Sequence, residues 1–416
     1  MADCCSAPGL MPVNQALTHL LSSVNTVPDV ESIPLELADG RILAQPVTSI
    51  LNVPAFNNSA MDGYAIRADE LSTDLQTSQT EFELVGKALA GQPFDGELQN
   101  GQCIRIMTGA VAPDSANAVA MQENTKAEGV RITLCQNHKL NENIRFAGED
   151  MKQGQAVFDA GHKITSVDIG LLASLGVPEV LVYRKLRVAL FSTGDELKLP
   201  GEPLATGDIY DSNRHSIKAM LKRMNVEVID MGIIRDDKNA IINAFLTADT
   251  EADAVISSGG VSVGEADYTK EVLDELGDIE FWKVAMKPGK PFAFGNLPNS
   301  VFFGLPGNPV SATVTFHVLA VPTLVKMMGT SYQTPLSLPA KTLAKIKKRP
   351  GRMDFQRGIA QIDEQGQLTV MPLSAQGSGI LSSMSRANCY IVLAQDDGGK
   401  NPDNMVSIQM FDAIVK

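Results

Sequence analysis

The sequence is poor in cysteine: five are scattered through 416 residues, and none forms a Cys-x-x-Cys pair. This scarcity excludes a disulfide framework and the usual structural zinc sites. The adjacent Cys4 and Cys5 have the chemistry to bind a soft metal ion, but we expect them to belong to a frayed terminus.

Long apolar runs are also missing. No uninterrupted run approaches the ~18 residues that a membrane span requires, and residues 1–11 lack the basic flank and apolar core of a secretory signal. The net charge of −13 disfavours binding to phosphate backbones. We therefore expect a cytoplasmic protein that binds neither membranes nor nucleic acid, and that holds any anionic substrate through a local basic cluster, a helix N-terminus or a metal ion.

Several common catalytic motifs are absent: there is no G-x-x-x-x-G-K-[ST], no G-x-G-x-x-G after a strand and no H-E-x-x-H. Residues 260–264 (GVSVG) do match the nucleophile elbow of α/β-hydrolases. A hydrolase of that type also needs a later histidine, and only His317 follows, within an apolar stretch. We expect His317 to be a core residue, so the hydrolase interpretation is disfavoured.

The length predicts two to four domains. Strands and helices alternate over 184–335, which is typical of a three-layer α/β sandwich on a mostly parallel sheet. Short strands with turn signals predict an inserted β domain and a C-terminal barrel or sandwich. Amphipathic stretches, with another short helix over 40–44, predict an elongated helical segment made of two separate pieces. The predicted parts are 8–47 with 154–183, 48–153, 184–335 and 336–416.

Glycine-bearing loops follow three of the strands predicted in 184–335. Ligands of doubly wound sheets lie outside the carboxyl ends of the strands. Glycine lets a backbone approach a ligand closely, and a helix N-terminus attracts anions. These loops are therefore candidate anion sites, although ordinary turns remain an alternative. The candidate substrate-binding residues in them are Gly194, Asp195, Ser258, Gly259, Gly260, Ser262, Gly307 and Asn308.

Two of these loops also carry acids: Asp195 with Glu196, and Glu265 with Asp267. Carboxylates beside an anion-binding loop favour a bridging Mg²⁺, which binds a few carboxylates together with phosphate oxygens. Stabilisation of helix N-termini by acidic side chains is the alternative. We predict Glu196, Glu265 and Asp267 as the metal ligands.

Three lysines, Lys283, Lys287 and Lys290, surround a Gly-Pro turn after another predicted strand. Their positive charges could bind phosphate or another oxyanion. Exposed lysines that only increase solubility are an equal alternative.

The chain, including these loops, resembles the MoeA family of molybdopterin molybdenumtransferases, which is related to the C-terminal domain of gephyrin. The resemblance is carried by motifs in order over some 300 residues. The matching stretches are PAFNNSAMDGYAI (54–66), IRIMTGA (104–110), IRFAGED (144–150), FSTGDEL (191–197), DSNR (211–214), IIRDD (233–237), SSGGVSVGEADYTK (257–270), KPGKPFAFG (287–295), GLPGNPVSA (304–312) and GRMDFQRG (351–358).

The resemblance implies the same four-part fold and a homodimer, with each active site between the α/β domain of one subunit and the β domain of the other. It implies Mg²⁺-dependent insertion of molybdate into adenylylated molybdopterin with release of AMP. Molybdopterin adenylyltransferase and molybdoenzyme chaperones are then expected partners. Two alternatives stay open: the chain is itself an adenylyltransferase, or it is a non-enzymatic dimeric scaffold.

The resemblance also implies roles for individual residues. Asp62 is expected to reach in from the partner subunit, Lys283 and Lys287 to grip molybdate or phosphate, and Pro306 and Pro309 to shape the third loop. Simpler interpretations remain for some of them, such as Asp236 serving as the N-cap of the next helix. The implied catalytic residues are Asp62, Thr108, Asp150, Glu196, Asp236 and Asp267. Arg357 and Ser378 match substrate-binding positions near the cleft.

Overall fold

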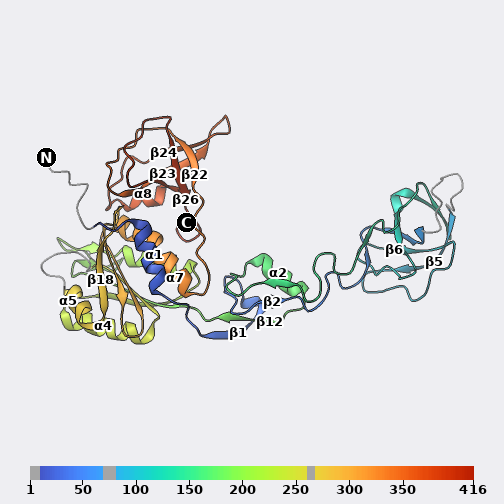
Figure 1. The fold of residues 1–416 in the computed structure, drawn as a ribbon, viewed down its shortest axis with the longest axis horizontal. Coiled ribbons are helices and arrows are strands. Elements are labelled where there is room, and N and C mark those ends of the chain that lie inside the picture. The colour runs from blue at the N-terminus through green and yellow to red at the C-terminus, as the bar shows by residue number, and fades with distance from the viewer. Residues whose placement is uncertain (1–9, 69–80, 260–267) are drawn as a thin grey trace.

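A computed structural model describes residues 10–68, 81–259 and 268–416 (Figure 1). The molecule is elongated. An α/β domain and a C-terminal barrel lie together at one end, a β lobe lies at the other end, and a narrow middle segment joins them (Figure 1). This arrangement confirms the predicted multidomain α/β plus β fold.

The α/β domain is built on a six-stranded sheet with the order β16-β13-β17-β21-β20-β18. Four neighbouring strands are parallel, and β20 runs antiparallel to both of its neighbours. The parallel strands are short, mostly buried apolar runs, as expected for a sheet covered on both faces. The strands are β13 (Arg187–Thr193), β16 (Glu227–Ile234), β17 (Ala254–Ser258), β18 (Asp278–Lys283), β20 (Pro291–Asn296) and β21 (Val301–Leu305), with a small pair of β14 (Leu197–Lys198) and β15 (Ile209–Tyr210).

Helices cover both faces of this sheet. Residues of α4 and α5 pack with one face in one apolar cluster, and those of α3 and the last long helix pack with the other. The helices are α3 (Asn213–Arg223), α4 (Lys238–Glu251), α5 (Tyr268–Leu276), α6 (Pro309–Thr315), the π-helical turn η4 (Phe316–Ala320) and α7 (Val321–Met327).

The continuous helix Pro309–Met327 has 19 residues, enough apolar length to cross a membrane. Polar residues such as Ser311, His317 and Lys326 interrupt it, so it is not an uninterrupted apolar run. Within the described residues it is the one such helix, and 83% of its most apolar window is buried inside the protein. That burial is what the core helix of an α/β sandwich shows.

The sequence predicted that helix α1 (Val13–Ser23) packs with the middle segment, and this prediction is wrong. Its buried residues Val13, Ala16 and Leu20 join the apolar cluster of the α/β domain, where α1 contacts α7 and η4. The middle segment therefore begins after α1, not at residue 8.

The middle segment is held by β1 (Val30–Pro34), which pairs with β12 (Glu179–Tyr183). The short 3₁₀ turn η1 (Leu35–Leu37) and α2 (Ser166–Ser174) pack beside them. Thr165 caps α2 in a reciprocal capping box with Asp168. The predicted helix over 40–44 is wrong, because Ile42 and Leu43 are extended and form bridges to the segments that flank α2.

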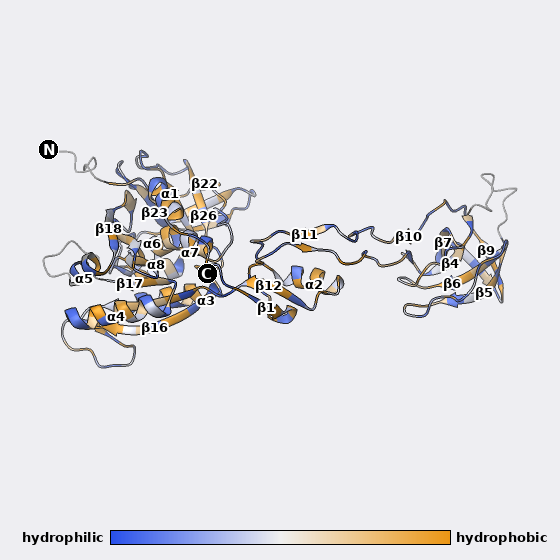
Figure 2. Cartoon of the chain, turned by 60° about the horizontal axis from the view of Figure 1, so that its bottom comes forward, coloured by the Kyte–Doolittle hydropathy of each residue, from blue (hydrophilic) through white to orange (hydrophobic). Residues whose placement is uncertain are grey.

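Two lengths of chain run side by side from the middle segment to the β lobe (Figure 2). They are joined by antiparallel pairs at both ends and by a bridge between Val53 and Met151. The pairs are β2 (Val47–Thr48) with β11 (Ala156–Phe158), and β3 (Asn58–Ser59) with β10 (Ile144–Arg145).

The β lobe contains a six-stranded sheet with the order β7-β4-β6-β5-β9-β8 and an apolar cluster on each face. This confirms that a β unit interrupts the chain. The strands are β4 (Gly63–Ile66), β5 (Glu81–Ala88), β6 (Gln102–Ile106), β7 (Ala118–Met121), β8 (Thr125–Glu128) and β9 (Arg131–Leu134), with a 3₁₀ turn η3 (Gln122–Asn124).

The C-terminal barrel closes because β23 pairs with both β24 and β25. A further strand, β19, joins β23 from the α/β domain and links the two units. The elements are β19 (Met286–Lys287), β22 (Leu338–Thr342), β23 (Met353–Ile362), β24 (Leu368–Pro372), β25 (Cys389–Leu393), β26 (Met405–Met410) and α8 (Leu381–Arg386).

Candidate active site

A group of acids lies where the neighbouring strands β13 and β16 end. The backbone N–H of Asp236 donates to Asp195 Oδ1 over 3.2 Å. Burial raises the pKa of the Asp236 carboxyl, and the negative charges of Asp195 and Glu196 raise it further. The sheet thus brings together three of the predicted acids from two loops that are about 40 residues apart in sequence.

Asp236 is not the cap of helix α4. Asp237 is the N-cap, and its side chain accepts a 2.9 Å hydrogen bond from the N–H of Ala240. The interpretation of Asp236 as a helix cap is therefore wrong. Its carboxyl is left beside the other two acids.

Gly194 allows the Glu196 carboxylate to take up its position. Gly194 has φ +144°, and a Cβ at this residue would lie 2.5 Å from Glu196 Oε2. Any larger residue would displace this carboxylate, so glycine is required at the end of β13.

Asn213, at the start of α3, ties two of the glycine-bearing loops together. Its side-chain amide donates to Ser258 Oγ over 2.9 Å and to the Gly307 carbonyl over 2.8 Å. Gly259 completes the connection, because its N–H donates to the Leu305 carbonyl. The sequence reasoning did not select Asn213 as a site residue, although the DSNR stretch that contains it is one of the matching motifs.

The third loop lies at the start of α6. Pro306 is buried, Gly307 and Asn308 are exposed, and Pro309 is the first residue of the helix. Asn308 is the N-cap residue but makes no side-chain capping bond.

The three lysines lie at the same edge of the sheet as these loops. In the antiparallel pairing, Lys283 lies opposite Pro291, and Ala293 lies opposite Gly304, so this turn follows on from the end of β21. Lys283 is exposed, whereas Lys287 Nζ lies 3.2 Å from the buried carboxylate of Asp354. The edge therefore runs from acids at β16 and β13, past glycine loops, to lysines at β20.

Arg357 and Ser378 lie where the barrel meets α6. The Ser378 carbonyl accepts a 2.9 Å hydrogen bond from the N–H of Val310. Arg357 is only 1% exposed, and its guanidinium donates to Ser383 Oγ and to the Gly377 carbonyl. In this structure Arg357 holds the segment that carries Ser378, and a direct contact with substrate stays a prediction.

The second group of predicted residues lies in the β lobe and in the chain that leads to it. Asp62 Oδ1 accepts hydrogen bonds from the backbone N–H and the hydroxyl of Thr108, both over 2.7 Å. These two bonds, followed by the charge of Arg105, lower the pKa of the Asp62 carboxyl. Asp150 is exposed, and its N–H donates to the Val53 carbonyl.

Replacing Thr108 tests this arrangement directly. We expect Thr108→Val to raise the pKa of Asp62 toward its ordinary value, because one of two donors to the ionised carboxylate is lost. Thr108→Ser keeps a hydroxyl and should leave the pKa nearly unchanged. A carboxyl-carbon NMR titration measures both, and an unaltered pKa in Thr108→Val contradicts the role assigned to the hydroxyl.

One chain does not bring the two groups together. The β lobe with Asp62 and Thr108 lies at the far end of the molecule from the α/β domain with Glu196 and Asp236 (Figure 1), and Asp150 lies in the chain that leads to that lobe. Gly260, Ser262, Glu265 and Asp267 lie outside the described residues. Among the described residues, no three His, Cys, Asp or Glu side chains are grouped closely enough to hold a metal ion.

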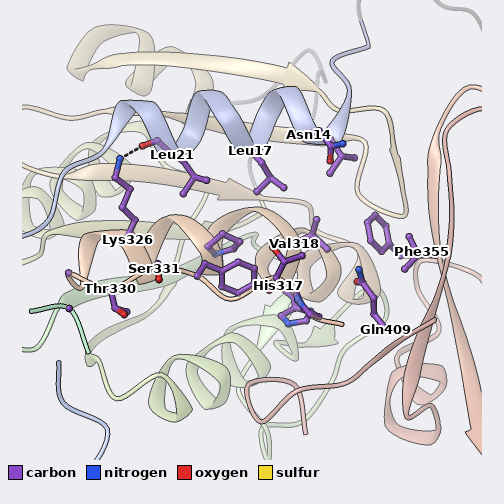
Figure 3. Close-up of a pocket in the computed structure, with 18 of the residues that line it drawn as sticks. Asn14, Leu17, Leu21, His317, Val318, Lys326, Thr330, Ser331, Phe355 and Gln409 are labelled. Atoms are coloured by element: carbon purple, nitrogen blue, oxygen red, sulfur yellow. Dashed lines mark hydrogen bonds between the residues drawn. The ribbon is translucent and has the colours of Figure 1, made fainter. Parts of the chain in front are cut away.

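A cavity of about 820 Å³ lies elsewhere, between α1, η4 with α7, and the barrel (Figure 3). Leu17, Leu21 and Val318 point into it, and none of the predicted site residues is among the described residues that line it. His317 borders this cavity, is 4% exposed and lies 3.0 Å from Asp412. It is thus a paired core histidine, as expected.

Comparisons with known proteins agree with this architecture. The families described as MoeA N-terminal region (domain I and II), probable molybdopterin binding domain and MoeA C-terminal region (domain IV) match residues 11–176, 189–326 and 339–409. The chain is 45% identical to a molybdopterin molybdenumtransferase of Haemophilus influenzae, over 98% of this chain and all of that one. A protein of the same name from Nostoc is 38% identical over 77% of this chain and 75% of its own length.

Solved structures give the same result. A molybdopterin biosynthesis MoeA protein from Pyrococcus horikoshii has a TM-score of 0.84 at 30% identity, covering 97% of this chain and 100% of that one. Another structure, also of a molybdopterin biosynthesis MoeA protein from Pyrococcus horikoshii, has a TM-score of 0.80 at 29% identity, covering 97% of this chain and 99% of that one. The sequence motifs, the four-part fold and these matches agree, and the chain belongs to the molybdopterin molybdenumtransferase family, which acts in molybdenum cofactor biosynthesis.

Proposed function

We propose that the chain inserts molybdate into adenylylated molybdopterin in a Mg²⁺-dependent reaction that releases AMP and gives molybdenum cofactor. The observation that carries the proposal is the distribution of charge along one sheet edge, with acids at one end and lysines at the other. The substrates have matching parts, because a phosphoanhydride needs a cation beside carboxylates and molybdate needs positive side chains.

We propose that a magnesium ion binds at these acids. Glu196 is a proposed ligand together with Glu265 and Asp267, and Asp236 lies beside Glu196. The raised pKa of Asp236 reflects burial and the negative charges of Asp195 and Glu196, and a divalent cation relieves that repulsion. When bound, Mg²⁺ neutralises the pyrophosphate charge and polarises its oxygens.

The chain's own groups position the substrate. Backbone N–H groups of the loops that contain Gly194, Gly259 and Gly307 face the phosphates, and Asn213 keeps two of these loops in register. We place molybdate at Lys283 and Lys287. Water then adds across the anhydride, so that AMP leaves and the terminal phosphate stays on the pterin.

A homodimer completes this site. Asp62, Thr108 and Asp150 lie too far from the acids of their own chain, so we propose that they act on the site of the partner subunit. Exposed apolar side chains near them support a covered face, since Phe56, Met61 and Phe146 are 46%, 42% and 43% exposed. A two-fold axis gives two equal sites per dimer. We place the reaction in the cytoplasm, with no nucleic-acid partner because the net charge is −13.

The decisive assay mixes the purified chain with adenylylated molybdopterin, Mg²⁺ and molybdate. We expect AMP release only when both ions are present, because the cation and the oxyanion occupy opposite ends of one site. An adenylyltransferase consumes ATP in place of releasing AMP, and a scaffold does neither. AMP release that persists after chelation of Mg²⁺, or without molybdate, refutes the proposal.

The metal site has a readout that does not depend on turnover. Mg²⁺ should lower the pKa of Asp236 in an NMR titration, because its charge offsets that of Asp195 and Glu196. Glu196→Gln should weaken this response, whereas Glu227→Gln, an exposed acid at the other end of the sheet, should not. A pKa of Asp236 that does not respond to Mg²⁺ places the metal elsewhere.

A further inference from the structure

A β-bulge interrupts β16 shortly before its end. Leu190 of β13 pairs with Asp230 of β16. The next residue of β13, Phe191, pairs with Gly232, so Met231 has no partner on β13. Gly232 has φ +79°, a left-handed conformation that glycine adopts at little cost. One extra residue therefore lies in β16, and every residue after it is shifted by one position relative to β13.

This shift decides which side chain lies beside Asp195. In the bulged register, Thr193 pairs with Ile234. Two residues farther along each chain, the N–H of Asp236 donates to Asp195 Oδ1 over 3.2 Å. Without the bulge, Thr193 would pair with the residue before Ile234, and Arg235 would lie opposite Asp195. The bulge therefore places a carboxylate there in place of a guanidinium.

Apolar packing does not choose between the two registers. Ile234 packs against the cluster that includes residues of α4 and α5, and the residue before it, Ile233, is also an isoleucine. A strand that slips by one residue turns its other set of side chains toward the core, and here an identical side chain would arrive. Strand pairing adds little, because β16 is an edge strand with β13 as its one neighbour among the described strands.

Buried ion pairs hold the bulged register. Asp230 accepts two hydrogen bonds from Arg214 Nη1, over 2.6 and 2.8 Å, and one from the N–H of Gly232 over 3.1 Å. Arg214 is buried, and its Nε donates to Asp211 Oδ2 over 2.7 Å. The Asp211 carboxylate also accepts from the hydroxyl of Ser192 on β13 over 3.2 Å. The start of α3 thus joins β13 to β16 at the bulge.

We propose that Arg214 and Asp230 are positioning residues for the transferase reaction, because they hold the register of β16 that brings the Asp236 carboxyl into the acid group. The inference rests on the proposed role of those acids. Arginine fits this task because its rigid fork binds two carboxylates in fixed directions, which an ammonium does not. A slip of one residue moves a side chain by about 3.3 Å, and misplacement by about 1 Å can cost about 100-fold in rate.

Steady-state AMP release by the full-length chain tests this role. We expect Arg214→Met to lower kcat about 100-fold and to change the KM for adenylylated molybdopterin much less, because the acid moves and the glycine loops stay. Arg214→Lys keeps the charge but not the fork, and should still lower kcat about 10-fold or more. Lys218→Met is the matched control. Its Nζ lies 2.6 Å from the same Asp230 carboxylate, but Lys218 is partly exposed and comes from the next turn of α3, so its loss should leave kcat nearly unchanged.

Deleting Met231 separates the effect of register from that of stability. The deletion removes the extra residue, so Thr193 can pair with Ile234 without a bulge. We therefore expect Arg214→Met with Met231 deleted to regain about 10-fold or more of the lost kcat, because the displaced carboxylate returns. A merely structural role for Arg214 predicts a further loss, since the deletion also removes a side chain that packs in the core.

A second change tests the same register in another way. In the slipped register residue 235 lies opposite Asp195, so Arg235→Asp should also raise the kcat of Arg214→Met. In the otherwise unaltered chain Arg235→Asp should not raise it. A crystal structure of Arg214→Met shows the register without any turnover, and we expect residue 235 in the place of Asp236.

Other outcomes overturn the proposal. It fails if neither second change restores activity to Arg214→Met, if Lys218→Met loses as much kcat, or if the crystal structure keeps Asp236 opposite Asp195. Full activity of Arg214→Lys contradicts the need for a fork. If circular dichroism shows that Arg214→Met does not fold, the rescue and the crystal structure are tested in Arg214→Lys. Absence of AMP release by the unaltered chain refutes the transferase proposal and leaves the crystallographic test of the register intact.

Discussion

Mixing two inactive variants should restore activity. We expect Asp62→Ala and Glu196→Ala each to lower AMP release by about 100-fold or more, the scale of losing a positioned catalytic acid or base. Refolded or coexpressed together, they should recover about a quarter of wild-type activity, because half of the dimers are mixed and each mixed dimer has one intact site. The reason is the distance between the β lobe and the α/β domain in one chain (Figure 1).

A matched mixture serves as the control. Asp62→Ala mixed with Thr108→Ala should stay inactive, because both changes fall in the same half of the site and their side chains are bonded to each other. Recovery in that mixture, or none in the first, contradicts a site shared between subunits. Size-exclusion chromatography with light scattering confirms that each variant is still a dimer.

Arg214→Met should destabilise the α/β domain by about 3–5 kcal/mol, the usual result of removing one partner of a buried ion pair. Arg214 is 4% exposed and lies 2.7 Å from Asp211 and 2.6 Å from Asp230. Methionine fills similar space but leaves both carboxylates without their main partner. Denaturation followed by the fluorescence of Trp282, the one tryptophan, reports on this domain.

Arg187→Met provides the comparison. Arg187 lies at the start of β13 in an exposed pair with Glu227, and its loss should cost about 0–1 kcal/mol. If the two variants lose the same free energy of unfolding, burial of the ion pair does not explain the effect of Arg214→Met.

The same network predicts a pH effect. Despite the opposing effect of burial, hydrogen bonds from Lys218 and Arg214 hold the pKa of Asp230 at about 2, below its ordinary value of 3.8. A lowered folded-state pKa stabilises the fold above pH 3.8, and this contribution is lost as the pH falls toward 2. Arg214→Met should therefore show a shallower loss of stability over that window.

The α/β domain was predicted well because its elements carry local signals. Apolar runs of strand length end at glycine or serine, and amphipathic helices follow them. Strand β17 (Ala254–Ser258) and helix α5 (Tyr268–Leu276), for example, lie within the region where alternating strands and helices were predicted. Since all parallel strands end at one edge, sequence alone also placed Glu196, Ser258 and Gly307 in neighbouring loops.

Contacts between distant segments explain the errors. Helix α1 has an apolar face that fits either the middle segment or the α/β domain, and its periodicity does not say which. Residues 40–44 have helical composition but complete two short ladders with Lys163 and Val182, so tertiary pairing overrides propensity. Asp236 and Asp237 are adjacent and chemically identical, and only the backbone conformation decides which one caps α4.

The two lengths of chain that carry the β lobe have a consequence for sequence change. They are joined by backbone pairing at three places: Thr48 with Ala156, Val53 with Met151, and Ser59 with Ile144. A residue inserted into one chain alone shifts the register of these pairings and changes the direction in which the β lobe, with Asp62, is held. Insertions of equal length in both chains lengthen the connection and keep the orientation of the β lobe. The length of the two paired chains therefore sets the distance between Asp62 and the middle segment, and the two chains must change length together.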